Sequence, residues 1–129
     1  MKSAYLLAAS VGLITPTWAQ ESAPMPCVNS ANTVERNHCF AAEVESIDTL
    51  LRVEVRRVER ILLSRDAEVP MLQLAPAFRA SQSKWQSFRD ADCTFRSQTY
   101  GDGTGGPAEG MWCQIEHGRT RLKYLQGMR

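Results

Sequence analysis

The sequence lacks an excess of charge of either sign, since its 129 residues carry 15 Lys and Arg against 14 Asp and Glu. A nucleic-acid-binding domain normally has a clear basic excess, so this balance argues against one. It also provides no general field that would attract an acidic partner. The length fits one domain, and a hydrophobic content of 43% with 22% charged residues is ordinary for a globular protein.

Motifs for catalysis and metal binding are missing as well. His38 and His117 are the two histidines, and no C-x-x-C pair is present, so the sequence contains no compact zinc ligand set. No serine lies in a G-x-S-x-G context, and the glycines of 101–106 are not followed by the Lys-Ser/Thr of a phosphate-binding loop. No pair of carboxylates stands out for general acid–base work. We therefore expect neither an enzyme nor a bound cofactor or metal.

The N-terminal residues have the layout of a secretory signal peptide. Lys2 provides a positive start, residues 4–14 carry no charge, and small residues at Thr17 and Ala19 predict cleavage after Ala19. A membrane anchor is the alternative, but it needs about 20 apolar residues, and neither this stretch nor any other is long enough. We expect a periplasmic or secreted protein with three parts, namely a signal peptide at 1–19, an extended leader at 20–31 and a helical domain at 32–129.

Cys27, Cys39, Cys93 and Cys113 all follow the predicted cleavage point. An even number of cysteines in a small exported chain favours two disulfides over a zinc site. Four cysteines allow three pairings, and spacing alone does not choose among them. We favour Cys27–Cys39 and Cys93–Cys113, because both close local loops and the second would join two segments across the glycine-rich stretch.

Apolar periodicity predicts an all-α fold, a three-helix antiparallel bundle with a long first helix at 32–64. One face of that helix carries Val44, Ile47, Leu51, Val55, Val58 and Leu62. A second helix at 76–99 has a stripe of Phe78, Ser81, Trp85, Phe88, Asp92 and Phe95. The glycines of 101–106 end it. A third helix from Pro107 has a stripe of Met111, Ile115, Gly118, Leu122 and Leu125. No segment alternates as a strand does.

The sequence around the third cysteine resembles a known family signature. Residues 81–93 read SQSKWQSFRDADC, which is similar to the Q-x-x-W-x-x-[FY]-R-D-x-x-C pattern of the bacterial lysozyme inhibitor LprI-like N-terminal domain family. The residues that match are Gln82, Trp85, Phe88, Arg89, Asp90 and Cys93. Asp48 with Leu51, and Cys113 with Arg121 and Leu125, resemble two further patterns of the family. The resemblance implies a helical, disulfide-bonded fold and the inhibition of lysozyme.

Side-chain chemistry assigns the signature a mainly structural role. Trp85 and Phe88 lie three residues apart, so we expect them to share one buried face of the helix. Arg89 can pair with Asp92 at i,i+3, and a neighbouring helix can use its guanidinium as well. On the first helix, Asp48 stands four residues before Arg52, in the favourable acid-first order.

Two surfaces remain as sites for a partner. The segment 101–109 is shaped to enter a cleft, with the candidate contacts Tyr100, Asp102, Glu109 and Trp112, although a plain connector is the alternative. The other surface is the row of Arg52, Arg56 and Arg60, which also fits a solvated helix face. The expected partner is lysozyme or another envelope protein. A structural or interaction protein of the envelope with no lysozyme binding is the second hypothesis, and the oligomeric state is not predicted.

Overall fold

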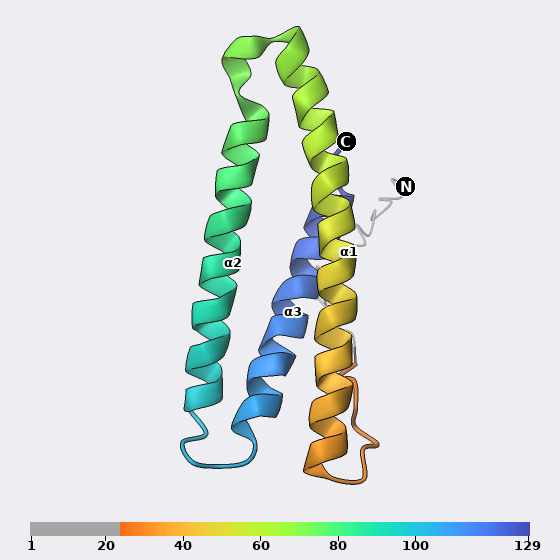
Figure 1. The fold of residues 1–129 in the computed structure, drawn as a ribbon, viewed down its shortest axis with the longest axis vertical. Helices are drawn as coiled ribbons and strands as arrows, with labels where there is room; N and C mark the ends of the chain where they lie inside the picture. Colours follow the sequence, from red (N-terminus) through yellow and green to blue (C-terminus); the bar gives the residue numbers. More distant parts are fainter. Residues whose placement is uncertain (1–23) are drawn as a thin grey trace, which may run out of the picture.

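The computed structural model describes residues 24–129 and contains three α-helices (Figure 1). These are α1 (Thr33–Glu68), α2 (Leu74–Gln98) and α3 (Gly106–Gln126), with a short 3-10 turn at Pro70–Leu72 between the first two. The prediction of an all-α bundle with a long first helix and two disulfides is confirmed. The signal peptide predicted at 1–19 lies outside the described residues.

A side-chain cap defines the start of α1. The carboxamide of Asn32 accepts the backbone N–H of Glu35 at 2.9 Å, and the Glu35 carboxylate accepts the N–H of Ala31 at 2.8 Å. The first bond satisfies an N–H group that the first helical turn leaves free, and the second satisfies the N–H of the residue before the cap. The helix then continues to Glu68, beyond the expected end at Ser64. Its buried residues are Phe40, Ile47, Leu51, Val58 and Leu62. Four of them belong to the predicted stripe, and Phe40 extends it toward the N-terminus.

Asp66 organises the tip at which α1 turns back into α2. Its carboxylate accepts the backbone N–H groups of Leu74 at 2.7 Å and Ala75 at 2.8 Å, so the end of α1 caps the start of α2. Gln73 takes a left-handed conformation with φ of 48° at this junction. The helix begins two residues before Pro76, which is tolerated there because N–H groups of the first turn need no partner within the helix.

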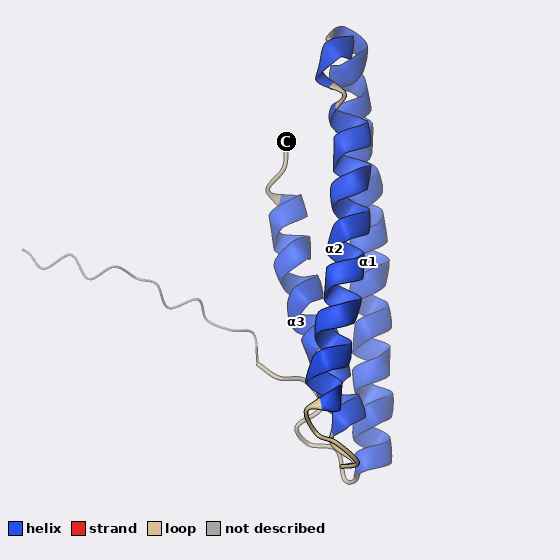
Figure 2. Ribbon diagram, turned by 90° about the vertical axis from the view of Figure 1, so that its left-hand side faces the viewer, coloured by secondary structure: helices blue, strands red, loops and turns tan. Residues whose placement is uncertain are grey.

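The third helix lies along the side of the α1–α2 hairpin and ends before the hairpin's tip (Figures 1 and 2). A Cβ atom on Gly118 would lie 2.5 Å from Cγ2 of Ile47, so the absence of a side chain lets α3 approach α1 closely. Arg57 of α1 holds the far end of α3 by donating to the carbonyls of Leu125 at 2.7 Å and Met128 at 3.0 Å.

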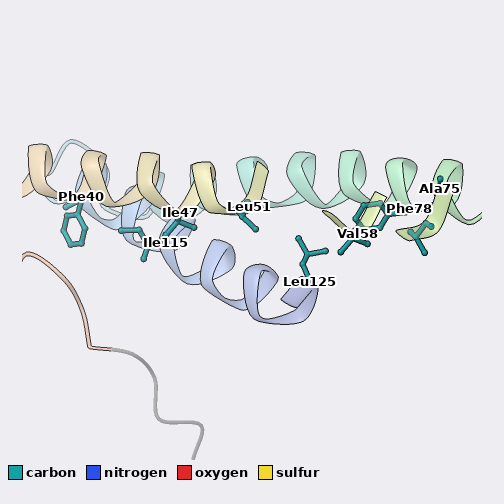
Figure 3. Packing of buried hydrophobic residues seen from close by; sticks show 10 residues of the cluster. Phe40, Ile47, Leu51, Val58, Ala75, Phe78, Ile115 and Leu125 are labelled. Atoms are coloured by element: carbon teal, nitrogen blue, oxygen red, sulfur yellow. The ribbon is translucent and has the colours of Figure 1, made fainter. Parts of the chain in front are cut away.

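Buried side chains form a narrow core that runs along the bundle from Phe40 to Ala75 (Figure 3). Ile115 and Leu125 of α3 are completely buried within it. The disulfide Cys27–Cys39 ties the segment before α1 to that helix, with Cα atoms 5.9 Å apart. Cys93–Cys113 joins α2 to α3 at 5.4 Å. Among residues 24–129, no helix is long and apolar enough to cross a membrane.

Candidate binding site around Trp85

The signature residues of α2 divide between the interior and the surface. Gln82 and Arg89 are buried, Trp85 is half-buried, and Asp90 and Phe88 are exposed, Phe88 by 56%. The prediction that Phe88 shares a buried face with Trp85 is therefore wrong. The buried face of α2 passes through Phe78, Gln82, Arg89 and Cys93. Phe88 precedes Arg89 by one residue, which turns it about 100° away from that face.

Arg89 crosses from α2 to α1 and pairs with Asp48. Its Nη1 lies 2.7 Å and its Nη2 3.5 Å from the two carboxylate oxygens of Asp48. A contact between Arg89 and a neighbouring helix was predicted without a named partner, and Asp48 is that partner. The predicted pairing of Arg89 with Asp92 is wrong, because the Asp92 carboxylate lies 2.8 Å from Nε2 of His117. The expected pair of Asp48 and Arg52 does not form. Arg52 instead donates to the hydroxyl of Thr49 at 2.8 Å.

Trp85 lies between two arginines from different helices. The guanidinium carbon of Arg89 is 5.1 Å from the indole centroid, and that of Arg121 on α3 is 5.6 Å from it. Arg121 also donates from Nε to the Gln82 side chain at 3.3 Å. Together with Asp48, these residues connect all three helices. We call this set, Asp48, Gln82, Trp85, Arg89 and Arg121, the signature cluster.

Two open grooves flank Trp85. One lies between α2 and α3, has a volume of about 570 Å³ and is lined by Trp85, Arg96, Glu116, His117, Thr120, Arg121 and Tyr124. The other, of about 300 Å³, has its lining on α1 and α2 and includes Asp48, Arg52, Arg56 and Arg89. Pockets that bind small molecules have volumes of about 300–1,000 Å³. We call the first one the α2–α3 groove.

The two arginines of the α2–α3 groove differ in their charge environment. Arg96 forms ion pairs with Glu109 and, at 2.8 Å, with Glu116. The hydrogen bond that Arg96 donates to Glu116 raises the pKa of Arg96 above its usual value; burial acts in the opposite direction, and Glu109 raises the pKa further. Arg121 has no carboxylate within 4.0 Å among residues 24–129. Burial lowers the pKa of Arg121 below its usual value.

The predicted loop contacts are only partly brought together. Tyr100 is half-exposed, and its hydroxyl lies 3.4 Å from Oε2 of Glu109. Asp102 is exposed in the same loop. Trp112 instead packs against Phe40 of α1, with ring centroids 6.4 Å apart. Glu109 is not a free charge, because Arg96 neutralises it.

The cysteine pairs leave no thiolate for a metal. Ligand atoms of Cys93, Cys113 and His117 lie within 4.8 Å of one another, which is a spacing that a metal site could use. The two sulfurs are bonded to each other at 2.09 Å, however, and a cysteine must be a free thiolate to bind zinc. The favoured pairing of Cys27 with Cys39 and of Cys93 with Cys113 is confirmed.

Sequence reasoning missed the role of Arg121 as part of a cluster, although it noted the residue within a family pattern. It also missed Asp66, whose capping role depends on a contact across the hairpin. A third omission is the exposed apolar tip, where Met71 is 92% exposed and Val69 and Leu72 are about half-exposed. The prolines at 70 and 76 disfavour helix in this segment, but they carry no signal for its apolar surface.

Comparison with known families agrees with the resemblance of the signature. The family model described as "Lysozyme inhibitor LprI" matches residues 27–125. The match includes every residue of the signature cluster and all four cysteines. Searches of curated proteins and of solved structures found no similar protein.

Proposed function

The chain belongs to the LprI lysozyme inhibitor family, and from this we propose that the protein is exported, acts by binding rather than catalysis, and inhibits lysozyme. The observation that carries the proposal is the family match over residues 27–125, which covers both disulfides and almost all of the three helices. The disulfides support export, because such bonds persist mainly in oxidising compartments outside the cytoplasm.

We place the lysozyme contact on the loop between α2 and α3, at the end of the bundle opposite the hairpin tip (Figure 1). A c-type lysozyme is cationic, so local acidic groups would favour the approach. The loop contains Asp102 and no basic residue. Because Glu109 is paired with Arg96, Asp102 is the acidic group, unpaired within residues 24–129, that the loop itself offers to a partner. Arg56 and Arg60 on α1 are exposed and would repel the same target.

The local structure of this loop supports a preorganised contact. Gly101 has φ of 54°, in the left-handed region that glycine tolerates, and the N–H of Gly103 donates to the carbonyl of Tyr100 at 3.0 Å. A Cβ atom on Gly105 would lie 2.9 Å from the Tyr100 ring, so this ring packs directly over the loop backbone. A loop ordered before binding loses less conformational entropy in a complex.

The test is a turbidity assay on bacterial cell walls with purified c-type lysozyme and the protein from residue 20 onward. Replacing Asp102 by lysine removes the acidic group and adds a repulsive one. We expect Asp102→Lys to weaken inhibition roughly tenfold, which corresponds to about 1.4 kcal/mol of binding free energy. The far-UV circular dichroism of the variant should match the wild type, because Asp102 is exposed and makes no ion pair among the described residues.

The double reversal of Arg56 and Arg60 to glutamate is the matched control, since it changes charge on the exposed side of α1. We expect it to leave inhibition unchanged or to improve it slightly. Inhibition that survives Asp102→Lys but is lost in the arginine reversals would move the contact to α1. If the wild type does not inhibit at micromolar excess, the protein is better explained as an envelope interaction protein that does not bind lysozyme.

A further inference from the structure

The guanidinium of Arg121 has unused hydrogen-bonding capacity in the α2–α3 groove. Its Nε donates to Oε1 of Gln82 and its Nη2 to Oγ of Ser81, both at 3.3 Å. Both acceptors are neutral and both distances are long for such bonds. A guanidinium has five N–H donors, so three remain without a partner among residues 24–129.

The other arginines that link helices around Trp85 already have acidic partners. Arg89 has Asp48, and Arg96 has both Glu109 and Glu116. Arg121 is half-buried like Arg96 but has no carboxylate nearby. Removing a cation from water without a counter-charge is unfavourable, and burial accordingly lowers the pKa of Arg121. Arg121 is therefore the arginine of the groove that makes no direct ion pair with the residues of 24–129.

Two aromatic rings lie beside the guanidinium of Arg121. Its guanidinium carbon lies over the rings of Trp85 and Tyr124, 5.6 Å and 5.0 Å from their centroids. Cation–π attraction favours a cation over the face of an aromatic ring. The N–H groups that do not reach Gln82 or Ser81 are left for hydrogen bonding with a ligand. A carboxylate matches them best, because its two oxygens accept two parallel N–H bonds in the same plane.

The remaining lining of the groove selects among anions. Glu116 also lines it, with a side chain 44% exposed. A second negative charge on a ligand would increase the repulsion from Glu116, so a phosphate dianion is less suited than a carboxylate. Thr120 adds a hydroxyl, while Trp85 and Tyr124 add apolar surface that the chain of a peptide can cover.

We propose that the α2–α3 groove binds an acidic side chain, Asp or Glu, from an extended segment of a partner protein. The carboxylate pairs with Arg121, and the neighbouring peptide chain lies against Trp85 and Tyr124. This surface is distinct from the loop around Asp102, which suits a cationic partner. The proposal therefore does not rest on lysozyme inhibition and holds or fails separately.

The experiment is an NMR titration of the ¹⁵N-labelled, disulfide-bonded protein from residue 20 onward, without lysozyme. The probe is the blocked peptide acetyl-Gly-Glu-Gly-amide, and acetyl-Gly-Gln-Gly-amide is the matched neutral probe. We expect the Trp85 indole N–H and the Arg121 Nε–H signals to shift saturably with the Glu peptide. One charge-assisted contact of this kind corresponds to a dissociation constant on the order of 10 mM or weaker. The Gln peptide should bind at least about tenfold more weakly.

Three variants locate the effect. Arg121→Gln should abolish the saturable shift of the Trp85 signal. Tyr124→Ala should weaken binding several-fold with little loss of stability, because Tyr124 is 58% exposed, and it decides the question if Arg121→Gln does not fold. Arg60→Gln removes an exposed charge on α1 and should change nothing.

Three results would overturn the proposal. One is an equal response to the Glu and Gln peptides, and another is binding that persists in a folded Arg121→Gln protein. The third is a tighter response to inorganic phosphate at the same signals, which would assign the groove to a different class of anion.

Discussion

Replacing Gly118 by alanine tests the close packing between α3 and α1. The added Cβ would lie 2.5 Å from Cγ2 of Ile47, whereas carbon atoms pack best at about 3.5–4.0 Å. The helices would have to separate by roughly 1 Å, or Ile47 would have to change rotamer, which a β-branched side chain in a helix resists. Ile47 is 6% exposed, so the strain falls inside the core.

Two opposing terms set the size of the effect. Overpacking of a core typically costs about 1–3 kcal/mol, whereas alanine is favoured over glycine inside a helix by about 1 kcal/mol. We expect a net loss of roughly 1 kcal/mol in the free energy of unfolding. For a domain of this size, that lowers Tm by about 4 °C. The measurement is thermal unfolding of the oxidised protein, followed by circular dichroism.

A double-mutant cycle with Ile47→Ala separates the clash from the helix propensity. Ile47→Ala removes Cγ2, so in that background Gly118→Ala should stabilise the protein by up to about 1 kcal/mol. The coupling energy between the two sites is then about 1–3 kcal/mol. If the two changes are additive within about 0.5 kcal/mol, Gly118 is not needed for close approach and the reasoning is refuted.

Two further substitutions test the signature helix and the tip. Trp85→Ala should lower the free energy of unfolding by about 2 kcal/mol, roughly half of the loss expected for a fully buried tryptophan. Phe88→Ala should lower it by less than about 1 kcal/mol, because Phe88 is exposed. Equal losses for the two variants in urea unfolding would contradict the burial pattern. Asp66→Ala should lower the free energy of unfolding by about 1–2 kcal/mol, because the N–H groups of Leu74 and Ala75 lose their acceptor. Hydrogen exchange at these two amides should become faster. Unchanged exchange there would exclude the capping role of Asp66.

Features that depend on local sequence were predictable. The stripe of α1 follows helical periodicity, so Ile47, Leu51, Val58 and Leu62 were expected to be buried and are. The break after α2 follows from the glycine-rich segment, and the pairing of cysteines that are close in sequence was favoured for the same local reason. These features need no knowledge of how one helix faces another.

The buried face of α2 was not predictable from hydrophobicity alone. Phe88 and Phe95 are 56% and 65% exposed, while Gln82 and Arg89 are 9% and 7% exposed. A polar group is more stable inside when another helix supplies a hydrogen-bond partner, and Asp48 does so for Nη1 of Arg89 and Arg121 for Oε1 of Gln82. Their positions relative to α2 follow from the packing of the bundle, which periodicity within one helix does not specify.

The acidic partner on which Arg89 depends can be identified by comparing the stability losses caused by Asp48→Asn and Asp92→Asn. The sequence favoured Asp92, three residues away, whereas the structure places Asp48 at 2.7 Å. Asp48→Asn leaves the nearly buried guanidinium of Arg89 with only the exposed Asp90 carboxylate, 3.7 Å from Nε, as a counter-charge. Breaking a fully buried pair costs up to about 3–5 kcal/mol, and we expect about 1–3 kcal/mol here, because the Asp48 side chain is 30% exposed. Asp92→Asn alters only the partly exposed contact with His117 and should cost about 1 kcal/mol or less. Urea unfolding of both variants decides between them: a loss for Asp92→Asn equal to or greater than that for Asp48→Asn would show that Arg89 depends on its helical neighbour and not on α1.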